Sequence, residues 1–572
     1  MKVIKPGKAD IRVKHLALGL IGVSILSTLL VGCTSKDNTH VTQTEQNKQN
    51  TVTSTTSSQT KVPSVSKSSQ LIDEQHSTVY YEIFVRSFYD SDGDGIGDIR
   101  GIMEKLDYLN DGNEATTNDL GIGGIWLMPI QPSPSYHGYD VTDYRSVNPD
   151  YGTMEDMEML IEEAHKRGIK VIMDLVVNHS SNEHPWFKES AQDKESPYRD
   201  WYVWAEDHGR DTSGTSAASG ANPWYPMKDT HYLGTFWEGM PDLNFDNVAV
   251  RTEMKDIGQF WLSLGMDGFR LDAAKHIYED LQSDRNKETE DKNIAWWQEF
   301  RSGMNEINPE AYIVGEVWEN SAASVAPYLN KAFDSTFNFG LAESIIGSVM
   351  TERDNNMAFT LERTYKLFNN KSEGNYVDAI FLTNHDQNRV MSQLNGNVVH
   401  AKMAASILLT LPGNPFIYYG EEIGMLGAKP DEQIREPMIW YEGGTQGTGQ
   451  TTWEEPTLNR GEKVANVEQQ INKQDSLFSH YREWVRWRTE IMALHDGDIQ
   501  YYDTGNAQIL SYVRRTQLEQ VLVVHNLSDQ VQHVALEGTE YEYTSILKTT
   551  NKNTNLDPNL LVIHPYSSVV LK

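Results

Sequence analysis

Four apolar segments of the sequence are each followed at once by charged or polar side chains. Asp272 and Glu316 end two such segments that are neighbours along the chain, Arg270 stands two residues before Asp272, and Asp386 follows a later segment. Two carboxyl groups about 5 to 5.5 Å apart can act as nucleophile and proton donor, as in the cleavage of a glycosidic bond with retention. These residue types therefore fit acid-assisted nucleophilic chemistry, provided that the fold brings them together.

The elements that must position these residues are short apolar runs separated by helical stretches. Residues 154–167, for example, carry apolar side chains at helical spacing. Strands that alternate with helices form parallel sheets, and eight of them close into a (β/α)8 TIM barrel of the α/β class, with the active site at the C-terminal strand ends. The eight predicted strands are residues 79–84, 122–127, 169–175, 266–271, 312–314, 332–337, 379–382 and 415–418.

The spacing of the strands also predicts two further domains. About ninety residues separate the third and fourth strands, which is too long for a loop, so an inserted domain B is expected at residues 178–244. After residue 492 the sequence changes to short β-type runs with turn residues between them, which predicts an antiparallel C-terminal β-sandwich domain at 493–572. The catalytic barrel then takes residues 76–177 and 245–492.

The N-terminal residues are typical of an exported protein. Lys and Arg side chains precede an apolar run at residues 16–30, and Leu30-Val31-Gly32-Cys33 follows, which resembles the signal and cleavage motif of bacterial lipoproteins. We expect a signal peptide at 1–32, a lipid on Cys33, and a polar tether at 33–75 that has too few apolar side chains to fold. The protein would lie at the extracellular face of the cell membrane, which it would contact through this lipid alone.

The composition excludes one large class of partner. The chain of 572 residues has 49 Lys and Arg against 81 Asp and Glu, a formal net charge of −32, so a nucleic-acid backbone would be repelled. Its 14 Trp and 27 Tyr offer faces that can stack on sugar rings as well as fill a core. Cys33 is the single cysteine, so no disulfide forms within the chain. We expect a monomer with no nucleic-acid partner.

The polar segments at the strand ends resemble the signature regions of the α-amylase superfamily, glycoside hydrolase family thirteen. Within it they are similar to bacterial lipoprotein α-amylases of the group between α-amylases and the oligo-1,6-glucosidases and neopullulanases. The segments in question are 136–140, 174–179, 240–244, 268–276, 315–318 and 381–386.

The resemblance implies a role for each polar residue. Asp272 would be the nucleophile, Glu316 the general acid/base, and Asp386 a third carboxylate that holds sugar hydroxyls. We expect the cation of Arg270 to keep Asp272 ionised, and the neighbouring carboxylates to raise the pKa of Glu316. The substrate-binding residues that the resemblance implies are His137, Tyr139, Asp140, His179, Arg270, Lys275, His276, His385 and Arg389.

A calcium site is predicted in the first strand-to-helix loop. Asp90, Asp92, Asp94 and Asp98 alternate with other residues, as oxygen ligands of Ca²⁺ do, and Ile96 can offer its backbone carbonyl. The other interpretation is an Asp/Gly-rich turn in solvent. The family resemblance adds Asn178 as a ligand of a second calcium ion, together with the carbonyl of His276.

These observations predict hydrolysis of internal α-1,4-glucosidic bonds of starch, maltodextrin and maltooligosaccharides by double displacement. Lys275-His276 resembles the pair with which endo-acting α-amylases contact sugars beyond the scissile bond. Two alternatives stay open: an α-glucosidase that acts on α-1,6 bonds or transfers glucosyl units, and a surface glucan-binding lipoprotein without activity.

Overall fold

A computed structural model describes residues 78–572, apart from 114, 280–285, 443–446, 462–463 and 537–540. All of the described residues belong to one compact unit, Ser68–Lys572. The predicted signal peptide, Cys33 and the tether therefore lie outside the described residues. Within the part that the structure describes, no helix is both long enough and apolar enough to span a bilayer.

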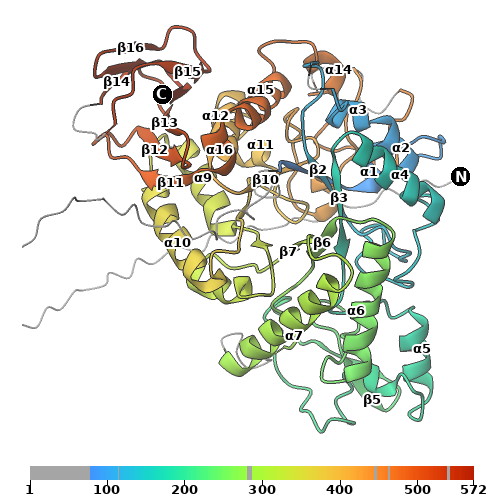
Figure 1. Cartoon of the computed structure of the whole chain (residues 1–572). Helices are drawn as coiled ribbons and strands as arrows, with labels where there is room; N and C mark the ends of the chain where they lie inside the picture. The colour runs from blue at the N-terminus through green and yellow to red at the C-terminus, as the bar shows by residue number, and fades with distance from the viewer. Residues whose placement is uncertain (1–77, 114, 280–285, 443–446, 462–463, 537–540) are drawn as a thin grey trace, which may run out of the picture. The chain divides into compact units, whose positions relative to one another are not determined.

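Eight parallel strands form the central sheet, in the order β8-β7-β6-β3-β2-β1-β10-β9 (Figure 1). A parallel bridge from Phe337, just after β8, to Ala379 in β9 links the two ends of the sheet, so the barrel is nearly closed. The fold class predicted from the sequence is thereby confirmed. The strands are β1 (Tyr80–Ile83), β2 (Gly124–Leu127), β3 (Lys170–Leu175), β6 (Gly268–Leu271), β7 (Tyr312–Gly315), β8 (Ser335–Thr336), β9 (Ala379–Phe381) and β10 (Asn414–Tyr418).

Helices follow the strands along the chain (Figure 1). They are α1 (Val85–Phe88), α2 (Ile99–Glu104), α3 (Leu106–Leu109), α4 (Met154–Lys166), α6 (Val248–Ser263), α7 (Lys287–Asn305), α8 (Ala322–Val325), the 3₁₀ helix η2 (Ala326–Leu329), α9 (Phe339–Thr351), α10 (Met357–Ser372), α11 (Val390–Gln393), α12 (Val398–Thr410), α13 (Asp431–Ile434), α14 (Val467–Gln470), α15 (Leu477–Glu490) and α16 (Met492–Asp496).

Helix α4 shows how the sequence pattern becomes structure. Thr153 and Asp156 form a reciprocal capping box at its start, which satisfies backbone donors that the first turn leaves unpaired. The predicted helix at 154–167 thus begins one residue after Thr153. Its buried apolar side chains fall three or four residues apart, at Met157, Leu160, Ile161 and Ala164.

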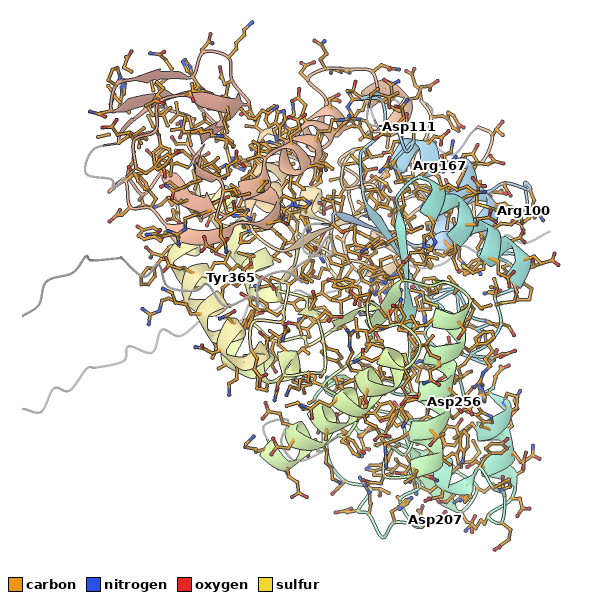
Figure 2. The ribbon with its side chains drawn as sticks, in the orientation of Figure 1. Arg100, Asp111, Arg167, Asp207, Asp256 and Tyr365 are labelled. Carbon is orange, nitrogen blue, oxygen red and sulfur yellow. The ribbon has the colours of Figure 1, made fainter. Side chains whose placement is uncertain are left out.

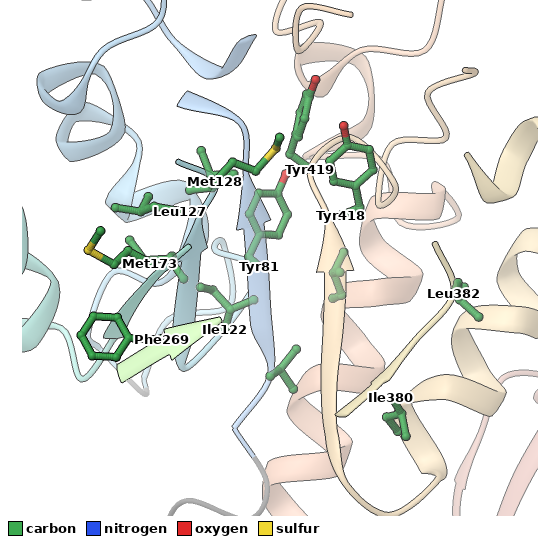
Figure 3. Close-up of a cluster of buried hydrophobic side chains, with 14 of the residues drawn as sticks. Tyr81, Ile122, Leu127, Met128, Met173, Phe269, Ile380, Leu382, Tyr418 and Tyr419 are labelled. Carbon is green, nitrogen blue, oxygen red and sulfur yellow. The ribbon is translucent and has the colours of Figure 1, made fainter. Parts of the chain in front are cut away.

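Side chains of the barrel strands alternate between an inner and an outer layer. Tyr80 belongs to the inner aromatic cluster, where its ring lies 5.3 Å from that of Tyr312 and 4.9 Å from that of Phe416. Gly124 leaves room for this ring, because a Cβ there would lie 2.4 Å from it. The neighbouring Tyr81 faces the helices instead, together with Leu127, Met173 and Phe269 of nearby strands (Figure 3). The barrel is therefore filled with side chains and leaves its chemistry to the strand ends.

The segment between β3 and α6 carries its own secondary structure. It contains α5 (Pro185–Gln192), the 3₁₀ helix η1 (Arg199–Trp201) and an antiparallel pair, β4 (Trp224–Met227) and β5 (Thr230–Leu233). Single bridges join His179 to Asp242 and Tyr202 to Leu243, so the segment leaves the barrel and returns to it along paired chains. This small sheet agrees with the insertion predicted from the length of the connection.

The C-terminal region is antiparallel, as predicted. One sheet has the order β11-β12-β13-β18-β15 and a second has the order β14-β17-β16, and a cluster of buried side chains that includes Leu522, Leu561 and Val569 lies between them. Helix α12 packs against both α15 and β13, which attaches this region to the barrel. The strands are β11 (Asp498–Tyr501), β12 (Ile509–Arg515), β13 (Gln520–Asn526), β14 (Gln532–Ala535), β15 (Ile546–Thr549), β16 (Asn555–Asp557), β17 (Leu560–Ile563) and β18 (Ser568–Leu571).

Candidate active site

A cleft of 770 Å³ opens at the C-terminal ends of the barrel strands. Residues that follow β6, β7 and β9 line it at the barrel mouth, and the inserted segment supplies one wall. The structure brings most of the predicted site residues to this cleft. Those that line it are His137, Tyr139, His179, Asp272, Lys275, His276, Glu316 and Asp386.

Arg270 lies beneath the cleft and forms ion pairs with three carboxylates. Its Nη1 lies 2.6 Å from Asp174 Oδ1 and 2.7 Å from Asp272 Oδ1, and its Nη2 lies 2.6 Å from Glu316 Oε1. The guanidinium is fully buried; burial alone would lower its pKa, but Asp174, Glu316 and Asp272 raise it well above the ordinary value. One permanent cation thus fixes Asp272 and Glu316 relative to each other. The sequence predicted the contact with Asp272 but not the contacts with Asp174 and Glu316.

Glu316 has the pKa that a proton donor needs near neutral pH. Burial raises its pKa most, Arg270 lowers it, and Asp272 and Asp386 raise it further, which places the pKa at about 7. The two carboxylates that the sequence singled out therefore add to a larger effect of burial. Glu316 Oε2 also accepts a hydrogen bond of 3.2 Å from the backbone N–H of Ala273, next to Asp272.

Asp386 is held between two cations at the other side of the cleft. Arg435 Nη2 lies 2.8 Å from Asp386 Oδ1, and His385 Nε2 lies 3.0 Å from Asp386 Oδ2. Burial alone would raise the pKa of Asp386, but His385 and Arg435 hold it well below its usual range. Asp386 is thus an ionised hydrogen-bond acceptor in the cleft, whereas Glu316 can carry a proton.

Tyr139 lies between the carboxylates around Arg270 and the pair of His385 and Asp386. Its hydroxyl donates to Asp174 Oδ2 at 3.1 Å and lies 2.6 Å from His385 Nε2. Its ring is 5.6 Å from the His385 ring, at an interplanar angle of 17°. This aromatic face at the floor of the cleft is suited to stacking against a sugar.

The two histidines nearest Tyr139 have defined partners. His179 Nε2 lies 3.1 Å from the Tyr139 carbonyl and its Nδ1 lies 3.0 Å from Asn178 Oδ1, and burial lowers its pKa. His137 accepts a hydrogen bond from the Tyr139 backbone N–H at its Nδ1, and burial lowers its pKa as well. Both rings are therefore neutral at the cleft wall, and the single N–H of a neutral His179 ring can donate to only one of its two oxygen neighbours.

Asp140 and Arg389 lie outside the lining of the cleft. The Asp140 carboxylate is buried and accepts hydrogen bonds from Ser133 and Ser135, so it holds the turn that presents His137 and Tyr139. Arg389 is also buried; it donates to the backbone carbonyls of Ile434 and Tyr419. These two residues support the site from behind, and the structure does not bring them into it.

Aromatic and charged residues that the sequence did not single out complete the cleft. Trp237 of the inserted segment is 42% exposed, and Trp318, stacked 4.6 Å from Phe339, is 45% exposed. Tryptophan side chains are usually mostly buried, so two exposed indoles in a cleft stand out. In the sequence, the available signal for them was their position shortly after Gly234 and Glu316. The remaining additions are Ala217, Ala218, Phe236, Met240, Ala273, Lys429, Asp431 and Arg435.

Lys275 and His276 lie side by side on the same wall of the cleft. Lys275 Nζ is 2.5 Å from Glu319 Oε1, and His276 Nδ1 is 2.9 Å from Glu279 Oε2. Both side chains are therefore fixed by carboxylates while they line the cleft. This arrangement suits polar contacts with sugar units beyond Glu316.

The acidic loop after β1 gathers three of its carboxylates. Asp90, Asp92 and Asp98 can each offer an oxygen within 4.8 Å of the others, which makes a possible metal site. Asp90 also accepts backbone N–H groups from Gly93 and Gly95, and Asp98 caps α2. Asp94 and Ile96 lie in the same loop, where Asp94 Oδ1 accepts the Ile96 N–H at 2.7 Å, and neither belongs to the three-carboxylate group.

Asn178 is placed differently from this loop. Its amide nitrogen donates directly to the His276 carbonyl, so the two groups expected to share a second calcium ion bind each other. The nearby acids of the inserted segment are also engaged: Asp200 accepts from Asn244, and Asp207, labelled in Figure 2, pairs with Arg199 at 2.5 Å. Among the described residues, the carboxylates gathered for a metal are those of the first loop alone.

Comparisons with known proteins agree with this geometry. The family model for the alpha amylase catalytic domain matches residues 82–497, and the model for the alpha-amylase SusG C-terminal domain matches 509–570. Alpha-amylase 3 of Dictyoglomus thermophilum is 44% identical over 494 residues, which cover 86% of this chain and 93% of that protein. The crystal structure of an alpha-amylase from H. orenii has a TM-score of 0.80 and 46% identity, and covers 87% of this chain and 99% of its own. An oligo-1,6-glucosidase of Parageobacillus thermoglucosidasius is 31% identical over 521 residues, 79% of this chain and 90% of that protein.

Proposed function

The chain belongs to the alpha-amylase family and is a glycosidase of the alpha-amylase type, and from this premise we propose the details of its reaction. It hydrolyses internal α-1,4-glucosidic bonds of starch, maltodextrin and maltooligosaccharides with retention of configuration. The observation that carries the proposal is the bridge of Arg270 between Asp272 and Glu316 at the cleft floor.

Asp272 and Glu316 divide the first step between them. The Asp272 carboxylate attacks the anomeric carbon and forms a covalent glycosyl ester, while Glu316 gives its proton to the departing glycosidic oxygen. In the second step Glu316, now a carboxylate, takes a proton from water, and the resulting hydroxide equivalent displaces Asp272 from the sugar. The pKa of about 7 for Glu316 suits both duties near neutral pH.

The sugar at the reacting centre is held by the groups around Asp386. Its ionised carboxylate accepts hydroxyl protons, His179 and His137 offer neutral ring nitrogens, and Tyr139 offers its face. Lys275 and His276 hold the following units, and the exposed indole of Trp237 faces the same cleft. Asp140 and Arg389 act on substrate only through the residues that they support.

We propose that the acidic loop binds Ca²⁺. Carboxylate oxygens are the ligands that this hard cation prefers, and the proposal is supported by the approach of three of them, two of which are buried. Asp90, Asp92 and Asp98 would hold the ion, with Asp94 and the Ile96 carbonyl as the remaining predicted ligands. The ion would supply rigidity to the loop after β1.

We also propose that the mature chain is lipid-anchored through Cys33 outside the cell. The proposal is supported by the basic residues, apolar run and Leu-Val-Gly-Cys motif of the N-terminus. Metabolic labelling with a radioactive fatty acid is expected to mark the wild-type chain and not the Cys33→Ser variant. Equal labelling of the wild type and the variant would contradict the proposed lipid anchor at Cys33.

The hydrolysis itself is tested with soluble starch, maltoheptaose, pullulan and isomaltose. We expect iodine staining of starch to fall well before reducing ends are abundant, as internal cleavage requires, and the released anomers to be α when read at once by NMR. The variants Glu316→Gln and Asp272→Asn are expected to lose about 10⁴-fold or more in kcat while they still bind maltoheptaose. A fully active Glu316→Gln variant would overturn the assignment.

A matched control is available at the opposite end of the barrel. Asp378 is also a buried carboxylate; it precedes β9 and accepts hydrogen bonds from Asn338 and from Tyr365, which Figure 2 labels. Asp378→Asn should leave kcat on starch unchanged within about twofold.

Release of glucose from isomaltose or panose from pullulan at rates near that of starch cleavage would favour the α-1,6 alternative.

A further inference from the structure

Glu82 is a buried carboxylate inside the barrel wall that the reaction scheme above does not use. It lies on β1 between Tyr81 and Ile83 and is 1% exposed. Its Oε1 meets Nδ1 of His385 in a short hydrogen bond, and the His385 ring is fully buried. A carboxylate at this position costs desolvation energy that a neutral side chain would avoid, so its partner is informative.

Both ring nitrogens of His385 face oxygen atoms of acidic groups. Nε2, on the side away from Glu82, lies 3.0 Å from Asp386 Oδ2 and 2.6 Å from the Tyr139 hydroxyl. Because carboxylates accept and do not donate, Nδ1 and Nε2 each carry a hydrogen. The Tyr139 hydroxyl then turns its own hydrogen to Asp174, at 3.1 Å. A continuous set of hydrogen bonds thus runs from Glu82 to the carboxylates of the cleft.

We propose that Glu82 is a positioning residue for the reaction: it orients the His385 ring and keeps it an imidazolium, so that His385 holds Asp386 ionised and Tyr139 turned to Asp174. Its effect on turnover rests on the proposed function of the cleft. Its effect on the protonation of His385 does not, because that depends only on the buried contacts.

The electrostatics of the site support this geometry. Burial alone would lower the pKa of His385, but Asp386 and Glu82 raise it to about 10. His385 is therefore charged at neutral pH and loses its proton only as the pH rises through about 10. Other charged or titratable groups also act on this set from the elements packed around it: Tyr139, Asp174, Arg270, Glu316, Tyr418, Glu421 and Arg435.

Glu422 provides a matched control within the same protein. It is another fully buried glutamate, and its Oε1 accepts hydrogen bonds from Tyr81 at 2.8 Å and Tyr108 at 2.5 Å. Neither partner is a histidine, and Glu422 does not line the cleft. Glu422→Gln therefore measures what the loss of any buried carboxylate does to the barrel.

The experiment combines NMR and kinetics on the full chain. The protein is labelled with ¹⁵N in its histidine rings, and the His385 signals are identified by their loss in His385→Gln. We expect His385 to stay an imidazolium up to pH 9 in the wild type and in Glu422→Gln, and to titrate at least one pH unit lower in Glu82→Gln than in the wild type. We expect kcat on maltoheptaose to fall about tenfold or more in Glu82→Gln and to stay within about twofold in Glu422→Gln.

Each outcome decides the proposal. An unchanged His385 titration in Glu82→Gln overturns it, and so does an unchanged kcat. If Glu82→Gln does not fold, Glu82→Asp replaces it, because this variant keeps the charge but moves the carboxylate away from His385. A lower kcat with His385 still charged at pH 9 then supports the role of Glu82 in orienting the ring. A wild-type kcat in Glu82→Asp overturns the proposal. Failure of the proposed function would differ, because the wild type would then be inactive on every α-glucan while the titration of His385 still moved.

Discussion

Two sets of buried arginines show how differently the protein can satisfy a cation. Arg270 lies beneath the cleft among three carboxylates, and Asp174, Glu316 and Asp272 raise its pKa above the ordinary value in spite of burial. Arg514 and Arg488 lie where β12 and α15 meet the end of α12, and both are fully buried. No carboxylate pairs with either one among the described residues, which changes what each cation can do.

Backbone carbonyls satisfy the second set. Arg514 donates to the carbonyls of Thr410, Leu494 and Gly497, and Arg488 donates to those of Leu409, Leu411 and Gly413. Several of these carbonyls belong to helix C-terminal turns, which carry partial negative charge. Burial lowers the pKa of Arg514 to about 10 and that of Arg488 to about 9, so both remain charged at neutral pH.

The partners of each arginine determine whether its cation serves the reaction or attaches the C-terminal sheets to the barrel. Carboxylates around Arg270 can gain or lose protons and attack a substrate, so that cation tunes chemistry. Carbonyls around Arg514 have no such freedom, and the cation only joins the barrel to the C-terminal sheets. The same residue type at the same degree of burial thus serves two purposes, according to the oxygen atoms that it meets.

Between the two sets of arginines, the larger effect is expected from Arg270→Met. Loss of the cation removes the bridge between Asp272 and Glu316 and leaves the buried carboxylate of Asp174 without a cation. We expect kcat/KM on maltoheptaose to fall about 10³-fold and the free energy of unfolding to fall by about 3 to 5 kcal/mol. Initial rates and urea unfolding measure these two quantities. Retention of more than a tenth of the wild-type activity would contradict a chemical role for this cation.

A smaller effect, confined to stability, is expected from Arg514→Met. The carbonyls of Thr410, Leu494 and Gly497 lose their buried donor, so the free energy of unfolding should fall by about 1 to 3 kcal/mol. Activity at 25 °C should stay within about twofold, because no carboxylate of the cleft is touched. Thermal unfolding and starch hydrolysis on the same sample test this. A loss of kcat as large as that of Arg270→Met would remove the distinction between the two arginine sets.

The sequence predicted the first set far better than the second. Arg270, Asp272 and Glu316 follow strongly apolar runs, and polar residues at the ends of buried strands stand out without a structure. Arg514 lies within β12, in a C-terminal region for which the sequence predicted short β-type runs but no polar cluster; strands such as β16 (Asn555–Asp557) are short and polar and give no periodic signal. Its partners lie up to 104 residues away, on another part of the fold.

Side-chain direction was the other quantity that the sequence did not contain. Asp140 belongs to the same motif as Tyr139, yet its carboxylate turns to Ser133 because of the local turn, and Arg389 turns to backbone carbonyls. In the sequence, Glu82 is one residue of the predicted strand at 79–84. Its importance depends on His385, which lies 303 residues away in the sequence and comes close because β9 and β1 both pair with β10 in the sheet.

The pH dependence sharpens the picture of the Arg270 set. Glu316 must be protonated to release the leaving group, and its pKa is about 7, so kcat/KM on maltoheptaose should fall about tenfold per pH unit above pH 7. An aryl maltoside whose phenolate departs without a proton should show no such decline over the same range. A decline at the same pH with both substrates would mean that another group sets it, and the assignment of Glu316 as the proton donor would be wrong.

The acidic loop after β1 offers a similar comparison for a carboxylate, and we expect an effect there on stability alone. Asp90 is surrounded by backbone N–H groups as Arg514 is by carbonyls, so its charge could be satisfied with or without a metal. If Ca²⁺ binds Asp90, Asp92 and Asp98, it stabilises the folded state by about 2.7 kcal/mol at a hundred times its Kd. Chelation with EDTA should then lower Tm by several degrees, with activity at 25 °C unchanged within about twofold.

Asp90→Asn should abolish the response to EDTA, while the exposed Asp94→Asn should only weaken it, since Asp94 lies outside the three-carboxylate group. An EDTA-insensitive Tm in the wild type would mean that backbone donors alone satisfy this loop, as carbonyls alone satisfy Arg514.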